Sequence, residues 1–151
     1  MAALLIRNMN WNKYITEKLL KKGLLNGVCL TSPHGHCLYE YGILSNTGTE
    51  NDWSLFSRAF PDPDAALMNG FEISLNYNYT GTLMNNRLYK QKYKVYKQTY
   101  CSMYATVVGG YDGLIVCKLP YGLLICTFFG GLNSPHSVVK EVESFCDKLR
   151  A

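Results

Sequence analysis

Six cysteines and three histidines are the residues whose types could support metal or thiol chemistry. The cysteines are Cys29, Cys37, Cys101, Cys117, Cys126 and Cys146. None of them has CxxC spacing, and His34 and His36 precede Cys37 without the second ligand pair that a zinc site needs. Several cysteines fall inside apolar runs, which is typical of buried thiols and not of the disulfides of a secreted protein. We therefore expect no metal and no disulfide.

Motifs for catalysis are equally sparse in the sequence. We find no glycine-rich phosphate loop and no Ser, His and Asp arrangement in a recognisable local context. His136 falls in the first turn of an expected helix, where exposure to solvent explains it more simply than proton transfer does. We therefore predict a protein that is not an enzyme, with no catalytic residues and no cofactor.

A cationic strip follows residues 88–98. Lys90, Lys92 and Lys94 alternate with aromatic and aliphatic residues, so a strand would place their ammonium groups on one face. With Arg87 and Lys97 they make five positive charges that no acidic residue interrupts. We call these five residues the cationic strip, which suits actin, phosphoinositide headgroups or a nucleic-acid backbone. The alternative interpretation is an edge strand whose lysines prevent aggregation.

Hydrophobic spacing indicates the elements that position these residues, beginning with a helix and a hairpin. The helix is predicted over residues 11–22, because Asn10 can cap its start and Gly23 can end it. Residues 27–31 and 37–41 read as two short strands joined by a turn that contains Pro and Gly. A hairpin therefore follows the first helix.

The remaining sequence predicts one or two short helices, then sheet, then a long helix. The short helices are expected at residues 53–60 and 64–68. Strands are expected at residues 71–75, 88–98, 100–108, 113–118 and 123–128. Ser134 and Pro135 then open an amphipathic helix that carries Val138, Val142 and Phe145 along one face.

Length and composition fit one globular domain over residues 1–151. Fifteen basic against eleven acidic residues give 15 − 11 = +4, which favours acidic partners without the strong bias of a dedicated nucleic-acid binder. No apolar run approaches the roughly 20 residues needed to cross a bilayer, and the apolar start is too short for a signal peptide. We therefore expect a cytoplasmic protein that does not bind nucleic acid.

Three parts of the chain resemble the profilin family. They are Asn10-Trp-Asn-Lys-Tyr14, which looks like the family's Trp-x-x-Tyr segment, the late strand pair, and the last helix from Ser134. The resemblance implies an α+β fold with a central antiparallel sheet of about six or seven strands. It also implies that the N- and C-terminal helices pack together on one face, with short helices on the other.

The resemblance implies a groove for proline-rich peptides between the terminal helices. Trp11 and Tyr14 stand at matching aromatic positions, while Leu38 replaces the family's hairpin tryptophan and Lys148 replaces an aromatic or His position. A proline-rich segment is already extended, so it loses little entropy when its rings pack between flat aromatic side chains. The simpler interpretation is that Trp11 and Tyr14 only pack on the sheet.

The resemblance also implies an actin-binding surface on the later strands and the last helix. Lys97 and Lys140 match basic contact positions, and Glu141 lies beside Lys140. The family's basic pair after the next strand corresponds here to the uncharged residues 105–108. Because actin is acidic, exposed lysines should raise the rate of encounter.

We therefore predict a monomeric, cytoskeleton-associated protein that binds monomeric actin and regulates filament assembly. Proline-rich peptides of actin nucleators and anionic phosphoinositide headgroups are its further expected partners. The alternative is a scaffold module of the roadblock or longin type in trafficking or signalling complexes. That alternative requires an exposed apolar dimer face, and a tight homodimer without actin affinity would favour it.

Overall fold

The computed structural model describes residues 10–47, 50–62, 64, 70–76, 88–131 and 134–150. Its elements, in chain order, are α2 (Trp11–Lys18), the 3-10 helix η1 (Leu20–Lys22), β1 (Gly27–Thr31), β2 (Cys37–Gly42), α3 (Glu50–Ala59), β3 (Phe71–Leu75), β4 (Tyr89–Gln98), β5 (Ser102–Val107), β6 (Gly113–Leu119), β7 (Gly122–Phe128) and α5 (Pro135–Arg150). This order confirms the predicted succession of helix, hairpin, helix, sheet and final helix. The helix expected at residues 64–68 lies outside the described residues, except for Asp64.

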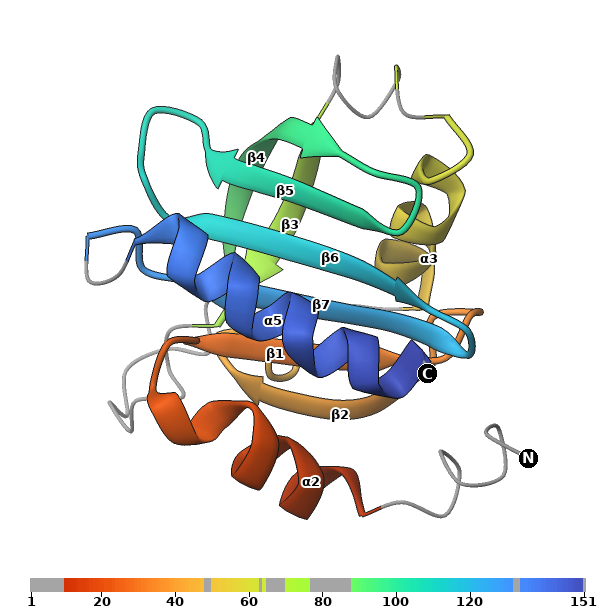
Figure 1. Ribbon diagram of the computed structural model, residues 1–151. Coiled ribbons are helices and arrows are strands. Elements are labelled where there is room, and N and C mark those ends of the chain that lie inside the picture. Colours follow the sequence, from red (N-terminus) through yellow and green to blue (C-terminus); the bar gives the residue numbers. More distant parts are fainter. Residues whose placement is uncertain are drawn as a thin grey trace.

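The strands form one seven-stranded sheet in the order β2-β1-β7-β6-β5-β4-β3 (Figure 1). Every neighbouring pair is antiparallel. The pairing of β1 with β7 joins the first hairpin to the last one, so strands from distant parts of the chain lie side by side in the sheet. The interpretation of residues 88–98 as an edge strand is wrong, because β4 pairs with β3 on one side and β5 on the other.

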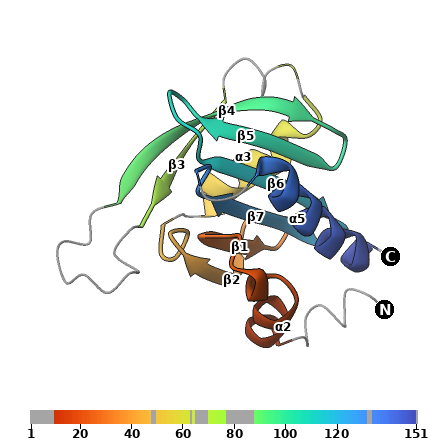
Figure 2. The same ribbon diagram turned by 60° about the vertical axis from the view of Figure 1, so that its left-hand side comes forward.

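Helices α2 and α5 cover the same face of this sheet, and α3 covers the opposite face (Figures 1 and 2). Ile15 of α2 and Val142 of α5 share one core cluster with Leu124 of β7. Phe56 of α3 belongs to a second cluster with Ile125, the neighbour of Leu124 along β7. Successive residues of a strand face opposite sides, so β7 supplies both cores in alternation. The predicted three-layer α+β architecture is confirmed.

Local signals explain why the first helix begins and ends where it does. The Asn10 side chain accepts a hydrogen bond from the Lys13 backbone N–H at 3.2 Å, which satisfies one of the free donors of the first turn. The α-helix ends at Lys18, and a 3-10 turn continues it to Lys22. Gly23 ends that turn with a φ of 67°, a left-handed conformation that glycine adopts without strain.

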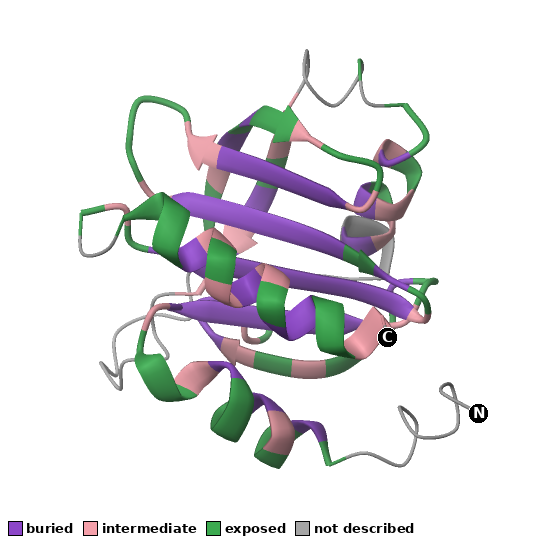
Figure 3. Cartoon of the chain, viewed as in Figure 1, coloured by how far each residue is buried: buried purple, intermediate pink, exposed green. Residues whose placement is uncertain are grey.

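The central strands are covered on both faces, which explains their unbroken apolar sequence. All residues of β1 and β7 are buried, and Lys118 is the exposed residue of β6 (Figure 3).

Among the described residues, no helix is both long enough and apolar enough to span a membrane.

The six cysteines are all free thiols, but they are not all buried. Cys29, Cys117, Cys126 and Cys146 are buried. Cys101 is partly exposed and Cys37 is exposed, so the expectation of buried thiols is wrong for Cys37. Cys37 begins β2, which lies at the edge of the sheet and has β1 as its partner strand.

Candidate functional site

The predicted groove residues lie where α2 approaches α5. The Tyr14 ring packs against the Phe145 ring of α5, with their centroids 5.4 Å apart. Trp11 meets Tyr14 edge to face at 6.0 Å. Trp11 is only 8% exposed and belongs to the core, whereas Tyr14 is half-buried. Tyr14 therefore offers the more accessible ring of the two.

A small apolar depression continues from Trp11 toward the strands. It is lined by Trp11, Leu30, Thr31, Leu38, Leu119, Tyr121 and Gly122. Leu38 is 44% exposed there, so it occupies the rim and leaves part of its side chain accessible. Tyr121 lies in the turn between β6 and β7, and we did not predict it as a groove residue. An aromatic residue in the Leu-Pro-Tyr-Gly turn could have indicated it. Lys148 is exposed on α5 and does not line this depression.

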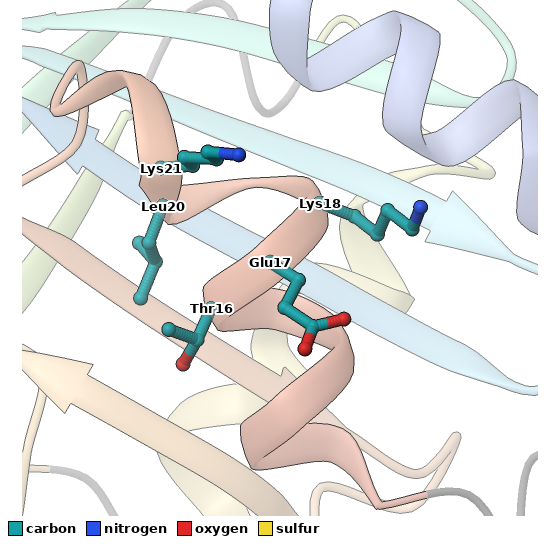
Figure 4. A pocket seen from close by; sticks show the side chains of 5 residues that line it. All are labelled: Thr16, Glu17, Lys18, Leu20 and Lys21. Carbon is teal, nitrogen blue, oxygen red and sulfur yellow. The ribbon is translucent and has the colours of Figure 1, made fainter.

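A second, more open hollow lies along α2 (Figure 4). Its lining residues are Thr16, Glu17, Lys18, Leu20 and Lys21. Figure 4 shows the side chains of Glu17 and Lys18 on one side of the helix and those of Thr16 and Leu20 on the other. Two ammonium groups, one carboxylate and no aromatic ring make it unsuited to stacking proline rings.

The four lysines of the cationic strip lie on the face of the sheet that carries α5. Lys94 pairs with Thr106, and Lys97 pairs with Tyr104, which belongs to the core cluster beneath α2 and α5. Directly paired residues of an antiparallel ladder point to the same face. Lys90, Lys92, Lys94 and Lys97 are exposed. Arg87 lies outside the described residues.

An alternating strand should place apolar side chains on the opposite face of β4, and they are buried there only in the middle of the strand. Tyr93 and Val95 are buried in the core beneath α3. Tyr89 is 60% exposed, so the prediction of an apolar face fails at the start of the strand.

Lys140 and Glu141 point in different directions from α5. Glu141 Oε1 accepts from Lys22 Nζ at 2.5 Å, an ion pair that joins α5 to η1. Because each helical residue turns by about 100°, Glu143 lies about 160° around the helix from Glu141 and about 60° from Lys140. Glu143 contacts Tyr104 of β5, so Lys140 leans toward the cationic strip and Glu141 leans away from it.

A polar cluster that the sequence did not reveal fixes α5 to the sheet. Glu143 Oε1 accepts from Ser102 Oγ at 2.6 Å, from Tyr104 OH at 2.8 Å and from Cys117 Sγ at 3.5 Å. Arg150 Nη1 lies 3.5 Å from Glu143 Oε2. These contacts join residues far apart in sequence, so only the fold shows them.

Charge and burial oppose each other at Glu143. Burial raises the pKa of its carboxyl group, but hydrogen bonds from Ser102, Tyr104 and Cys117 and the charge of Arg150 together lower that pKa below its usual value. Burial, together with the hydrogen bond to Glu143, raises the pKa of Tyr104. The cluster therefore holds a carboxylate beside three neutral donors and the Arg150 cation, an arrangement that stabilises the packing of α5 on the sheet.

Arg150 anchors the C-terminal end of α5 to the sheet. Its guanidinium donates to the carbonyl oxygens of Lys118 at 2.9 Å and Cys101 at 3.2 Å. A cation at a helix C-terminus is favoured, and here it also satisfies two carbonyls of the sheet. Within the described ranges, no three His, Cys, Asp or Glu side chains gather in a way that could hold a metal ion.

Comparison with known proteins identifies the family. The profilin family model matches residues 9–151. The chain belongs to the profilin family. Compared with curated protein sequences, this profilin shows no match. Its fold is also that of a profilin, and the family match favours the profilin prediction over the alternative of a roadblock or longin scaffold module.

Solved structures show the same fold at low sequence identity. Acanthamoeba castellanii profilin IB is 18% identical, with a TM-score of 0.70, and the alignment covers 93% of this chain and 97% of that one. Mouse profilin IIa, in complex with a double repeat from the FH1 domain of mDia1, is 14% identical, with 94% and 97% coverage and a TM-score of 0.65. LokiProfilin2, in a complex with rabbit actin, is 16% identical, with 94% and 97% coverage and a TM-score of 0.61. The TM-scores support the shared fold, whereas the low identities leave each binding site of this profilin to be tested.

Proposed function

We propose that this profilin binds monomeric actin and regulates filament assembly in the cytoplasm, in association with the cytoskeleton. The observation that carries the proposal is the exposed lysine face of β4, with Lys97 at its end and Lys140 leaning toward it from α5. The protein acts through this surface and not as an enzyme. Sequestration or delivery of actin monomers is the proposed mechanism, with faster nucleotide exchange if binding shifts the conformation of actin.

Electrostatics supports this surface for an acidic partner. Lys90, Lys92, Lys94 and Lys97 lie on one face, and β4 offers no carboxylate among them. Glu72 of β3 is exposed and pairs directly with Lys92, so this face carries one carboxylate beside its four lysines. A predominantly positive face raises the rate at which an acidic protein arrives in the correct orientation. Salt should therefore weaken actin binding mainly by slowing association.

Charge reversal tests the actin surface. We expect Lys97→Glu combined with Lys140→Glu to weaken actin binding at low salt by about tenfold or more, because two attractive contacts become repulsive. The matched control is Lys13→Glu combined with Lys18→Glu, which makes the same change of net charge at exposed positions of α2. Monomer affinity is measured from the delay of actin polymerisation and from a pull-down. Equal loss in both double variants, or no loss in either, would reject the assignment.

A second function, binding of proline-rich peptides, is favoured by the Tyr14 ring and the depression beside Trp11. The rings of an extended proline-rich peptide can pack on Tyr14 while the apolar depression accepts a neighbouring residue. We expect Tyr14→Ala to reduce binding of an oligoproline peptide, measured by Trp fluorescence, by about tenfold. The control is Tyr111→Ala, at a tyrosine that is 84% exposed on another loop. If both variants bind equally well, the groove is not used.

Phosphoinositide binding is a third proposed property, and it would use the same cationic strip. Each lysine near an anionic membrane contributes about 1 kcal/mol, so the three lysines from Lys90 to Lys94 should give measurable binding at low salt. Vesicles with and without phosphatidylinositol 4,5-bisphosphate, compared at rising salt, test it. Because actin would meet the same face, actin and vesicles should compete.

A further inference from the structure

Two cysteines of the first hairpin, Cys29 and Cys37, are brought together although eight positions separate them. Cys29 pairs with Glu40 across the hairpin, and Thr31 pairs with Cys37, with Leu38 as the extra residue between these pairs. Cys29 and Thr31 are two positions apart on β1, so they point to the same face, and Cys37 therefore shares the face of Cys29. The Cys29 and Cys37 side chains lie close enough that each changes the pKa of the other.

The two thiols differ sharply in their access to solvent. Cys29 is 0% exposed and belongs to the core beneath α3, whereas Cys37 is exposed at the start of β2. The carboxylate of Glu40 lies 3.8 Å from Cys37 Sγ, on the same face. A reagent from solvent can thus reach Cys37, whereas Cys29 is closed to solvent.

Their contact also favours ionisation of Cys37 over ionisation of Cys29. The hydrogen bond with Cys29 is the largest influence on Cys37 and lowers its pKa, although partial burial and Glu40 act in the opposite direction. The same hydrogen bond and burial raise the pKa of Cys29. The thiolate is the reactive form of a cysteine, so the exposed sulfur is also the more reactive one.

We propose that Cys29 and Cys37 form an oxidation site in which hydrogen peroxide produces a reversible disulfide between β1 and β2. In the first step the Cys37 thiolate attacks one peroxide oxygen, the O–O bond breaks, and the departing hydroxide takes up a proton to become water. Cys37 is then a sulfenic acid. In the second step the Cys29 sulfur attacks the Cys37 sulfur, the S–O bond breaks, and the departing hydroxide and the Cys29 proton form a second water. Two thiols lose two electrons, and these reduce one peroxide to two waters.

The other cysteines of the chain provide a comparison. Cys117 and Cys146 are also hydrogen-bonded to each other, but both are buried. Cys101 is partly exposed, and its sulfur contacts the hydroxyl groups of Thr99 and Ser102. The pair formed by Cys29 and Cys37 therefore combines an accessible thiol with a second thiol in contact. That combination is what a sulfenic acid needs in order to be captured before it is oxidised further.

Peptide mapping after oxidation tests the site. The purified chain is treated with hydrogen peroxide, alkylated without reduction, digested and analysed by mass spectrometry. We expect a cross-linked peptide pair that contains Cys29 and Cys37, with a mass lower by two hydrogens, and we expect a thiol reductant to restore both thiols. In the reduced chain, iodoacetamide should label Cys37 at least about tenfold faster than Cys101, because thiolate content and exposure control the rate.

Two variants make the test specific. Cys29→Ala removes the capturing thiol, so Cys37 should accumulate as a sulfenic acid that dimedone labels. Cys101→Ser, the matched control at the other accessible cysteine, should form the Cys29–Cys37 cross-link at an unchanged rate. The proposal is overturned if the native chain gives dimedone-labelled Cys37, a disulfide-linked dimer, a different cross-link, or unmodified Cys37 at peroxide concentrations that oxidise Cys101.

Discussion

The Tyr104 hydroxyl donates a hydrogen bond of 2.8 Å to the Glu143 carboxylate. This bond connects the face of β5 with the inner side of α5, next to the surface proposed for actin. Because Lys140 lies less than one turn before Glu143, the position of Glu143 also sets the direction of Lys140. The orientation of the proposed surface thus depends on a polar contact beneath it.

Replacing this carboxylate should make stability depend on pH in a defined way. The pKa of Glu143 is lowered in the folded chain, so its contribution is fully present above the ordinary Glu pKa and is lost as pH falls through the folded value. We expect Glu143→Gln to reduce the free energy of unfolding at pH 7 by about 1–2 kcal/mol. The difference from the native chain should shrink below about pH 4.3, and urea denaturation at several pH values measures it. Glu17→Gln, on the exposed side of α2, is the control, and an equal effect there would contradict the role given to Glu143.

The ion pair between Lys22 and Glu141 should contribute little to stability. The two side chains are 65% and 33% exposed, and exposed pairs of this kind contribute about 0–1 kcal/mol. A double-mutant cycle with Lys22→Ala and Glu141→Ala should therefore give a coupling energy below about 1 kcal/mol that fades with salt. Because Glu141 leans away from the cationic strip, Glu141→Ala should change actin affinity less than Lys140→Ala does. The reverse order of these two variants would count against the orientation derived for α5.

Packing in the centre of the sheet should dominate stability. Leu124 of β7 is fully buried beneath α2 and α5, so Leu124→Ala removes apolar contacts and leaves a cavity. We expect a loss of about 2–5 kcal/mol in the free energy of unfolding. Leu88→Ala, at a residue that is 44% exposed, should cost less than about 1 kcal/mol, since nearly half of this residue remains in contact with water in the folded state. Similar losses for both leucines would show that the burial pattern is wrong.

Substitution of two glycines with positive φ can distinguish the cost of backbone strain from the cost of steric overlap. Gly23 has a φ of 67° and no atom within 4 Å of the place where a Cβ would stand. Gly42 has a φ of 64°, and a Cβ there would overlap the carbonyl oxygen of Asn26. We expect Gly23→Ala to destabilise the fold by about 1 kcal/mol and Gly42→Ala by more than about 2 kcal/mol. Thermal unfolding of both variants checks the order, and a smaller effect at Gly42 would be inconsistent with the close approach of the end of β2 to Asn26.

Much of the fold could be predicted because its signals are local. Asn10 and Gly23 bracket the first helix, and the spacing of Val138, Val142 and Phe145 defines the face of the last. The approach of the two helices came from the family resemblance, and the contact of Tyr14 with Phe145 confirms it. The sequence was misleading for the burial of Cys37, because burial there depends on the position of its strand in the sheet. Cys37 starts an edge strand and is exposed.

The candidate sites were predicted less completely, because they depend on register and on distant contacts. Simple alternation would put Lys97 on the face of Val95, but Tyr96 is an extra residue in a β-bulge that returns Lys97 to the face of Lys94. Nothing in the local sequence marks that bulge. Glu143 and Arg150 meet residues from other strands, so their roles appear only when the sheet is assembled.

The layer formed by α2 and α5 has a consequence for the order in which the chain acquires its shape during synthesis. Ile15 leaves the ribosome early, but Val142, in the same cluster, emerges more than a hundred residues later. Until then the apolar side of the first helix lacks the part of its cover that α5 supplies, and at synthesis rates of about 5–20 residues per second that interval lasts about 6–25 seconds. A nascent chain of this architecture should therefore depend on molecular chaperones at its leading end, and a stalled ribosome would expose that helix for as long as the stall persists.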